Sequence, residues 1–189
     1  MSGIVPAGST VHYRVTFLEM AARPEYGWPV APAGGEGALL RAEAPPAWYF
    51  LALYDAVGRA YAWTDRFATP REELAAWLAD PAVEMFTLLR HGWPHGFFVL
   101  DARAGDSCEL EYFGLVPEAI GRGLGRFLLR TAVLTAWERP GVRRLTVDTC
   151  SLDHPRALAL YQAAGFTVVA QEDRTRILVH DRDPAAIPT

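Results

Sequence analysis

The chain has 189 residues, of which 51% are hydrophobic and 21% are charged, and its formal net charge at pH 7 is −4. This length and composition are typical of a soluble globular protein with a sizeable core, so we expect a single domain over residues 1–189. The small negative charge and the absence of a basic run argue against nucleic-acid binding. No apolar run approaches the roughly 20 residues that span a membrane, and the N-terminus lacks a signal-peptide pattern, so we expect no membrane partner and a cytoplasmic location.

Cysteine and histidine usage predicts no metal site. Cys108 and Cys150 are too few for a disulfide framework or a CxxC metal site, and both fall in expected strands, so we predict buried, reduced thiols. His12, His91, His95 and His180 have no metal-ligand spacing with a carboxylate cluster.

The first part of the chain is expected to begin with a strand over Thr10 to Met20, which is rich in β-branched and aromatic residues. Residues 21–46 are rich in Pro, Gly and Ala and are expected to be irregular. Residues 47–57 are interpreted as a helix, with a strand as the alternative because the segment carries three adjacent aromatic residues. Residues 59–69 are expected to form a loop. Thr69, Pro70 and Glu72 then predict a capping box at the start of a second helix, which ends near Ala79.

The second part is expected to contain a hairpin of residues 83–90 and 96–103 around residues 91–95, followed by a central strand over 107–116. A helix over residues 123–138 places its apolar residues on one face, and residues 144–150 alternate as a strand. A further helix starts at Pro155 and ends before Gly165. Residues 166–171 and 174–180 are expected to form a last hairpin, and residues 181–189 a frayed tail. This order predicts an α/β fold, with a mixed sheet flanked by helices.

A glycine-rich turn joins the central strand to the helix that follows it. Gly121, Gly123 and Gly125 stand at alternate positions, where the absence of a Cβ lets the backbone approach a ligand closely. The start of a helix has unpaired N–H groups that suit a phosphate, and Arg122 and Arg126 add positive charge. The spacing fits neither the dinucleotide fingerprint, because Arg126 replaces its third glycine, nor a P-loop, which ends in Gly-Lys-Ser/Thr.

What remains, Ile120 to Gly125, resembles the pyrophosphate motif of the GNAT superfamily of acetyl-CoA-dependent N-acetyltransferases, usually Arg/Gln-x-x-Gly-x-Gly/Ala; Ile120 stands at its first position. His154 to Phe166 is similar to the other family motif, usually Asn-x-x-Ala-x-x-Leu-Tyr-x-x-x-Gly-Phe. His154 replaces the Asn, and the matching residues are Ala157, Leu160, Tyr161, Gly165 and Phe166. The order of elements also agrees with the family.

The resemblance implies a mixed, mostly antiparallel seven-stranded sheet with about four helices, in which the parallel central strands 107–116 and 144–150 splay apart. Acetyl-CoA would be the cosubstrate and would lie in the gap, without a metal. The cofactor-binding residues implied by the motifs are Phe113, Leu115, Val116, Gly121, Arg122, Gly123, Leu124, Gly125, Arg126 and His154.

The expected reaction is direct transfer of the acetyl group to a primary amine of a small molecule or peptide. Glu109 is the first candidate for the base, with Glu111 second and a water relay as the alternative, and strand alternation places Glu109, Glu111 and Phe113 on one face. Two carboxylates on one face are expected to raise one pKa. Tyr161 is the candidate acid for the departing thiolate.

The acceptor is expected to contact Trp63, Tyr54 and Asp65, which lie in or near the loop that borders this site in the family. Several alternatives stay open: a CoA-binding or sensor module without turnover, transfer of a longer acyl group, an acetyl-enzyme on Cys150, and a homodimer. Each candidate residue also has a structural interpretation, as an ion-pair partner, a core aromatic or a solvated charge.

Overall fold

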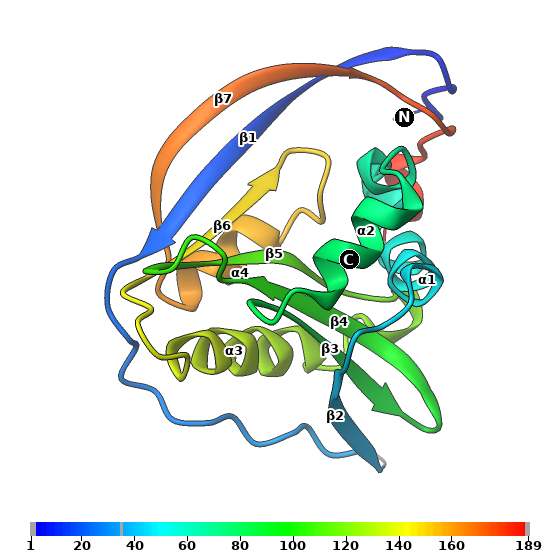
Figure 1. Ribbon diagram of the computed structural model, residues 1–189. Helices are drawn as coiled ribbons and strands as arrows, with labels where there is room; N and C mark the ends of the chain where they lie inside the picture. The colour runs from blue at the N-terminus through cyan, green and yellow to red at the C-terminus, as the bar shows by residue number, and fades with distance from the viewer. Residues whose placement is uncertain (1–2, 35, 188–189) are drawn as a thin grey trace.

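The computed structural model describes residues 3–34 and 36–187, which contain a seven-stranded sheet in the order β2-β3-β4-β5-β6-β1-β7 (Figure 1). Only β5 and β6 run parallel; all other neighbours are antiparallel. The strands are β1 (Thr10–Met20), β2 (Gly37–Ala42), β3 (Val83–Arg90), β4 (Trp93–Asp101), β5 (Ser107–Leu115), β6 (Arg144–Cys150) and β7 (Thr167–Ile177). The helices are α1 (Ala47–Gly58), α2 (Arg71–Ala79), α3 (Leu124–Trp137) and α4 (Ala157–Ala163). The predicted fold class is confirmed.

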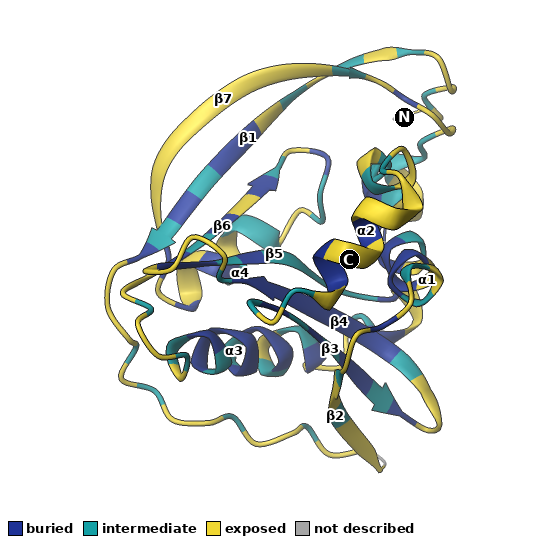
Figure 2. Cartoon of the chain, viewed as in Figure 1, coloured by how far each residue is buried: buried dark blue, intermediate teal, exposed yellow. Residues whose placement is uncertain are grey.

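Helices cover both faces of the central strands. On one face, α1 packs against β4 and β5, and α2 against β3; Phe50 of α1 meets the rings of Phe97 and Tyr112. On the other face, α3 packs against β4, β5 and β6 through its buried apolar residues. Figure 2 shows that the buried residues gather in these strands and on the inner side of α3. The described helices include none long and apolar enough to cross a membrane.

β1 and β7 form a long two-stranded arch that extends beyond the rest of the sheet (Figure 1). The pairing runs from Thr10–Ile177 to Glu19–Thr167 with one irregularity, so the predicted final hairpin is wrong. No glycine or proline interrupts this segment, and Arg14 binds Asp173 at 2.8 Å where the turn was expected. β7 is exposed along its length, as Figure 2 shows, because only β1 pairs with it.

Three further sequence predictions, each about a single segment, are wrong. Residues 37–42 form the edge strand β2 rather than irregular chain; the strand is mostly exposed and so carries little hydrophobic pattern. The β3–β4 turn has two residues instead of five, because His91 and Gly92 both adopt positive φ, as a tight hairpin turn requires. Pro70, not Thr69, caps α2, and no side-chain hydrogen bond forms there, so the predicted capping box is absent.

The C-terminal segment is also held in place, contrary to the expected frayed tail. Val5 pairs with Arg182, the Asp183 carboxylate accepts a hydrogen bond from the Ala185 N–H, and Ile187 is buried. Residues 188–189 lie outside the described part. The helix predicted at residues 47–57 is confirmed over its strand alternative and spans Ala47–Gly58, whereas the 59–69 loop contains two short 3-10 turns. Cys108 is buried and Cys150 half-buried, and both are free thiols.

Gly114 lets α1 approach β5 closely. A Cβ at this position would lie 2.3 Å from Cγ1 of the buried Val57. We therefore expect Gly114→Ala to lower the free energy of unfolding by about 1–3 kcal/mol, measured by urea titration, because overpacking forces the helix away. Gly27→Ala, where a Cβ would meet no atom within 4 Å, is the matched control. Equal stability of the two variants would contradict the close approach.

Candidate active site

The two parallel strands part after three residue pairs. β5 and β6 pair only at Ser107–Arg144, Cys108–Leu145 and Glu109–Thr146. Beyond Glu109, the edge of β5 that faces β6 has no strand partner, so its backbone groups are free to bond a ligand. A cavity of about 240 Å³ opens there, lined by residues of β5, β6, α4 and the turn before α3. The expected splay is therefore confirmed.

The glycine turn borders this cavity and fits a phosphate. Gly121 and Gly123 have φ values of +81° and +73°, a left-handed conformation that favours glycine. A Cβ on Gly121 would meet no atom within 4 Å, and both Gly121 and Gly125 line the cavity. No side chain caps the start of α3, so its first N–H groups are available. With Arg126 and Arg156 also lining the cavity, the residues present fit a bound diphosphate.

The structure brings only part of the predicted cofactor set to the cavity. Those that line it are Phe113, Leu115, Gly121, Gly125, Arg126 and His154. Val116 and Leu124 are buried in the core instead, and Arg122 and Gly123 are exposed on the turn. Polar and aromatic residues that sequence analysis did not single out also line the cavity, namely Tyr61, Asp148, Thr149, Asp153 and Arg156.

A β-bulge in β5 decides which way its side chains point. Val99 pairs with Tyr112 and Leu100 with Leu110, which leaves Glu111 without a partner on β4. The Tyr112 ring meets α1 at Tyr54, whereas the Phe113 ring meets Tyr161 of α4 on the opposite face. The expectation that Phe113 shares a face with Glu111 is therefore wrong, because the extra residue shifts the alternation.

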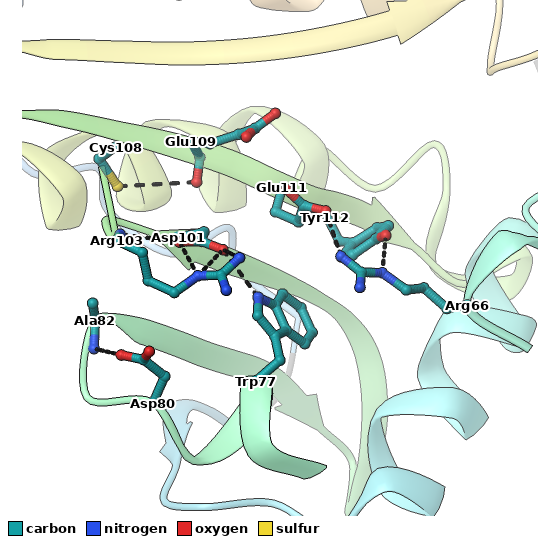
Figure 3. Close-up of polar contacts among 10 residues, drawn as sticks. All are labelled: Arg66, Trp77, Asp80, Ala82, Asp101, Arg103, Cys108, Glu109, Glu111 and Tyr112. Carbon is teal, nitrogen blue, oxygen red and sulfur yellow. Dashed lines mark hydrogen bonds and ion pairs between the residues drawn. The ribbon is translucent and has the colours of Figure 1, made fainter. Parts of the chain in front are cut away.

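Glu111 is held by an arginine from the 3-10 turn Asp65–Phe67. Nη2 of Arg66 lies 2.7 Å from Oε1 of Glu111, and Nε donates to the Tyr112 hydroxyl at 2.7 Å (Figure 3). The guanidinium also lies over the Trp77 ring, 4.4 Å from its centre. These contacts fix Glu111 at the cavity wall, with Arg66 as its ion-pair partner.

Glu109 occupies the last paired position, at the point where the strands separate. Its half-buried carboxylate lies beside Glu111 on β5, as Figure 3 shows, although it does not itself line the cavity. Burial, followed by the charges of Glu111 and Asp148, raises the pKa of Glu109 to about 7. The carboxyl group therefore changes protonation near neutral pH.

Asp148 stands on β6, across the gap from β5, and lines the cavity. The side chain is exposed to solvent within the cavity, but the cavity walls exclude much of the water around it. This desolvation, followed by the neighbouring charges of Asp153 and Glu111, raises the pKa of Asp148. Across the described residues, no group of His, Cys, Asp and Glu is arranged to hold a metal ion.

Trp63 contributes to the cavity wall. Its Nε1 donates to Oδ1 of Asp153 at 3.0 Å, a contact that joins the loop after α1 to the segment before α4. Tyr54 is 2% exposed and supports Trp63 from behind, with ring centres 5.5 Å apart, so it does not line the cavity. Asp65 is exposed and binds Arg176 of β7 at 2.8 Å.

Tyr161 lines the cavity from α4 and packs against Phe113 and Phe166, each ring centre 6.0 Å away. Burial raises the pKa of its phenol well above the ordinary value, because a phenolate there would lack solvation. Tyr161 therefore remains a protonated donor at the cavity wall.

Parted parallel strands, a phosphate-compatible glycine turn and a cavity between them define a CoA-dependent acyltransferase fold. The sequence profile of the Acetyltransferase (GNAT) family matches residues 41–166, and the chain belongs to this family. Acetyl-CoA is the usual cosubstrate of the family.

Solved structures with the same fold share little sequence identity with the chain. A GCN5-related N-acetyltransferase from Sphaerobacter thermophilus is 20% identical, with a TM-score of 0.59, over 94% of this chain and 54% of that one. An aminoglycoside acetyltransferase from an uncultured soil metagenomic sample is 17% identical, with a TM-score of 0.54, over 68% and 87%. A tandem GNAT protein from the clavulanic acid biosynthesis pathway is 15% identical, with a TM-score of 0.59, over 92% and 55%.

The chain spans only about half to two-thirds of the length of several solved structures that share this fold. No curated protein matches it.

Proposed function

We propose that the protein is an N-acetyltransferase that moves the acetyl group of acetyl-CoA directly to a primary amine. The observation that carries this proposal is the cavity between the parted strands, with carboxylates at the vertex of the splay and Tyr161 on the wall formed by α4. The free edge of β5 would hold the pantetheine arm, and the Gly121–Gly125 turn with Arg126 and Arg156 would hold the diphosphate.

The thioester supplies the acetyl group: the amine nitrogen attacks its carbonyl carbon, the C–N bond forms, the C–S bond breaks and CoA leaves as the thiolate. An aliphatic amine is protonated at neutral pH, with a pKa of about 10.4 for a lysine-like group, so it must lose a proton before it attacks. Glu109 stands at the vertex of the splay behind the cavity wall and accepts that proton through one bridging water, because its raised pKa suits a base near pH 7. The second nitrogen proton leaves to solvent.

The remaining roles belong to groups on the cavity wall. A backbone N–H of β5 donates a hydrogen bond to the thioester oxygen as negative charge develops on it. The Tyr161 phenol donates a hydrogen bond to the departing thiolate and keeps its own proton, and the thiolate takes up a proton from solvent. Trp63 limits the space open to the acceptor. Tyr54 acts on the acceptor site indirectly, because its ring packs against Trp63, and Asp65 acts indirectly through its ion pair with Arg176.

Direct transfer is favoured over an acetyl-enzyme on Cys150. Burial and the nearby Asp153 raise the pKa of the Cys150 thiol to about 11, so the nucleophilic thiolate is scarce at neutral pH. We expect Cys150→Ser to keep a kcat within about twofold of wild type in a steady-state assay, because the thiol takes no part in the transfer. Loss of activity with trapping of acetate on Cys150 in the wild type would contradict direct transfer.

The proposal is tested by measuring thiol release from acetyl-CoA in the presence of a panel of amines, with the acetylated product identified by mass spectrometry. Amine-dependent release is the expected result. Binding of acetyl-CoA without release from any amine would favour the alternative, a CoA-binding or sensor module. Faster release from longer acyl-CoA thioesters would instead assign a different acyl donor.

A further inference from the structure

The arginines near the acceptor side of the splay are already paired with carboxylates. Arg66 binds Glu111 at 2.7 Å, Arg174 binds Glu172 at 2.5 Å, and Arg176 binds Asp65 at 2.8 Å. In the part of the chain that the structure describes, neither Glu109 nor Asp148 forms an ion pair. Two carboxylates beside the cavity therefore have no protein cation in direct contact, although the charge of Arg174 acts on Asp148 from a greater distance and lowers its pKa.

Asp153 is the other carboxylate on the cavity wall near Asp148, and both of its oxygens are hydrogen-bonded to protein groups. Its two oxygens accept hydrogen bonds from the Trp63 indole, the Thr149 hydroxyl and the Cys150 N–H, at distances of 2.8–3.0 Å. Asp148 differs because it lines the cavity, is open to solvent there, and receives a hydrogen bond only from its own backbone in the part of the chain that the structure describes. Tyr61 and Trp63 supply aromatic surface to the same cavity, and such rings attract cations.

A monoamine would leave this site with unbalanced charge. Its ammonium group must become neutral before it attacks, and its proton passes to one carboxylate, which we have assigned as Glu109. Asp148 then remains a carboxylate in a partly desolvated cavity, where an unpaired charge is unfavourable. An acceptor with a second ammonium group would bring the missing positive charge into contact with Asp148.

We propose that Asp148 binds a second ammonium group of the acceptor, and that the substrate class is small aliphatic diamines and polyamines. This inference rests on the proposed acetyl transfer, which it deepens by naming the acceptor. Asp148 is here a specificity-determining residue: it touches the substrate away from the reacting nitrogen. An ion pair of this kind favours a diamine over a neutral analogue by about 10- to 100-fold.

The test compares alkane diamines of increasing length with amino alcohols of equal length, in which a hydroxyl replaces the second amine. We expect wild-type kcat/KM for the preferred diamine to exceed that of its amino alcohol by about 10- to 100-fold. In Asp148→Asn the ratio should fall to within about threefold. Glu138→Gln, which removes a carboxylate that binds Arg23 and does not line the cavity, should keep the wild-type ratio.

A second measurement separates this inference from the proposed function. Calorimetry of the same diamine with the CoA-saturated protein should show a dissociation constant about tenfold larger for Asp148→Asn than for wild type. Equal use of diamines and amino alcohols by wild type, or a preference that survives in Asp148→Asn, would overturn the inference. If no amine promotes thiol release but the calorimetric difference is found, the proposed acetyl transfer fails while diamine recognition by Asp148 stands.

Discussion

Glu109→Gln is expected to lower kcat/KM by about 100- to 10,000-fold at pH 8, the range that loss of a general base produces. In wild type, kcat/KM should rise with pH through about 7, because only the ionised Glu109 carboxylate accepts a proton. The variant should lack this rise, since glutamine does not titrate. The profile is measured between pH 5.5 and about 8.5 with an acceptor whose amine titrates near pH 10, so that the acceptor stays protonated throughout.

A neighbouring variant makes the assignment specific. The charge of Glu111 helps to raise the pKa of Glu109, so Glu111→Gln should keep the pH-dependent rise but move it to lower pH. Glu43→Gln, which removes an exposed carboxylate after β2, should reproduce the wild-type profile. A rise near pH 7 that persists in Glu109→Gln would assign proton removal to another group, such as a water relay that does not involve Glu109.

Local sequence patterns predicted most of the fold. The limits of β1 and β6 agree with the sequence in full, and the limits of α3 agree to within one residue, because alternation and helical periodicity are strong in these segments. The predicted final hairpin failed because β7 follows β1 from residue 167 to residue 177, a pairing between segments more than about 140 residues apart that no local pattern reports. The sequence analysis did not predict strand β2, because an exposed edge strand carries little hydrophobic pattern.

The sequence also predicted part of the candidate site, where the residues belong to local patterns. The glycine turn and the α4 segment are short local motifs, so the sequence alone could place Gly121, Gly125 and Tyr161 beside a common ligand. Asp148 could not be placed in this way, because its position at the cavity depends on where β6 parts from β5. The β-bulge at Glu111 was hidden too, since it appears only when β5 is aligned with β4.

Glu109→Gln is also expected to make the protein more stable than wild type at pH 8. Burial and the neighbouring carboxylates raise the folded-state pKa of Glu109 to about 7, from an ordinary value of 4.5. The folded state therefore binds this proton more tightly than the unfolded state, and stability is lost as pH rises from about 4.5 to about 7. Above pH 7 the loss is complete, and a neutral glutamine of similar shape avoids it.

The expected gain for Glu109→Gln at pH 8 is about 1–3 kcal/mol in the free energy of unfolding, reduced from the full linkage value because Glu109 is only half-buried. This corresponds to a rise in Tm on the order of 5 °C for a chain of this size. At pH 4.5 wild type and variant should melt at the same temperature, because the wild-type carboxyl group is then protonated in the folded state. Glu43→Gln should show no gain at either pH. A Glu109→Gln variant that is inactive yet no more stable at pH 8 would mean that the carboxylate is not destabilised by its surroundings, and the physical basis for its role as a base near neutral pH would be lost.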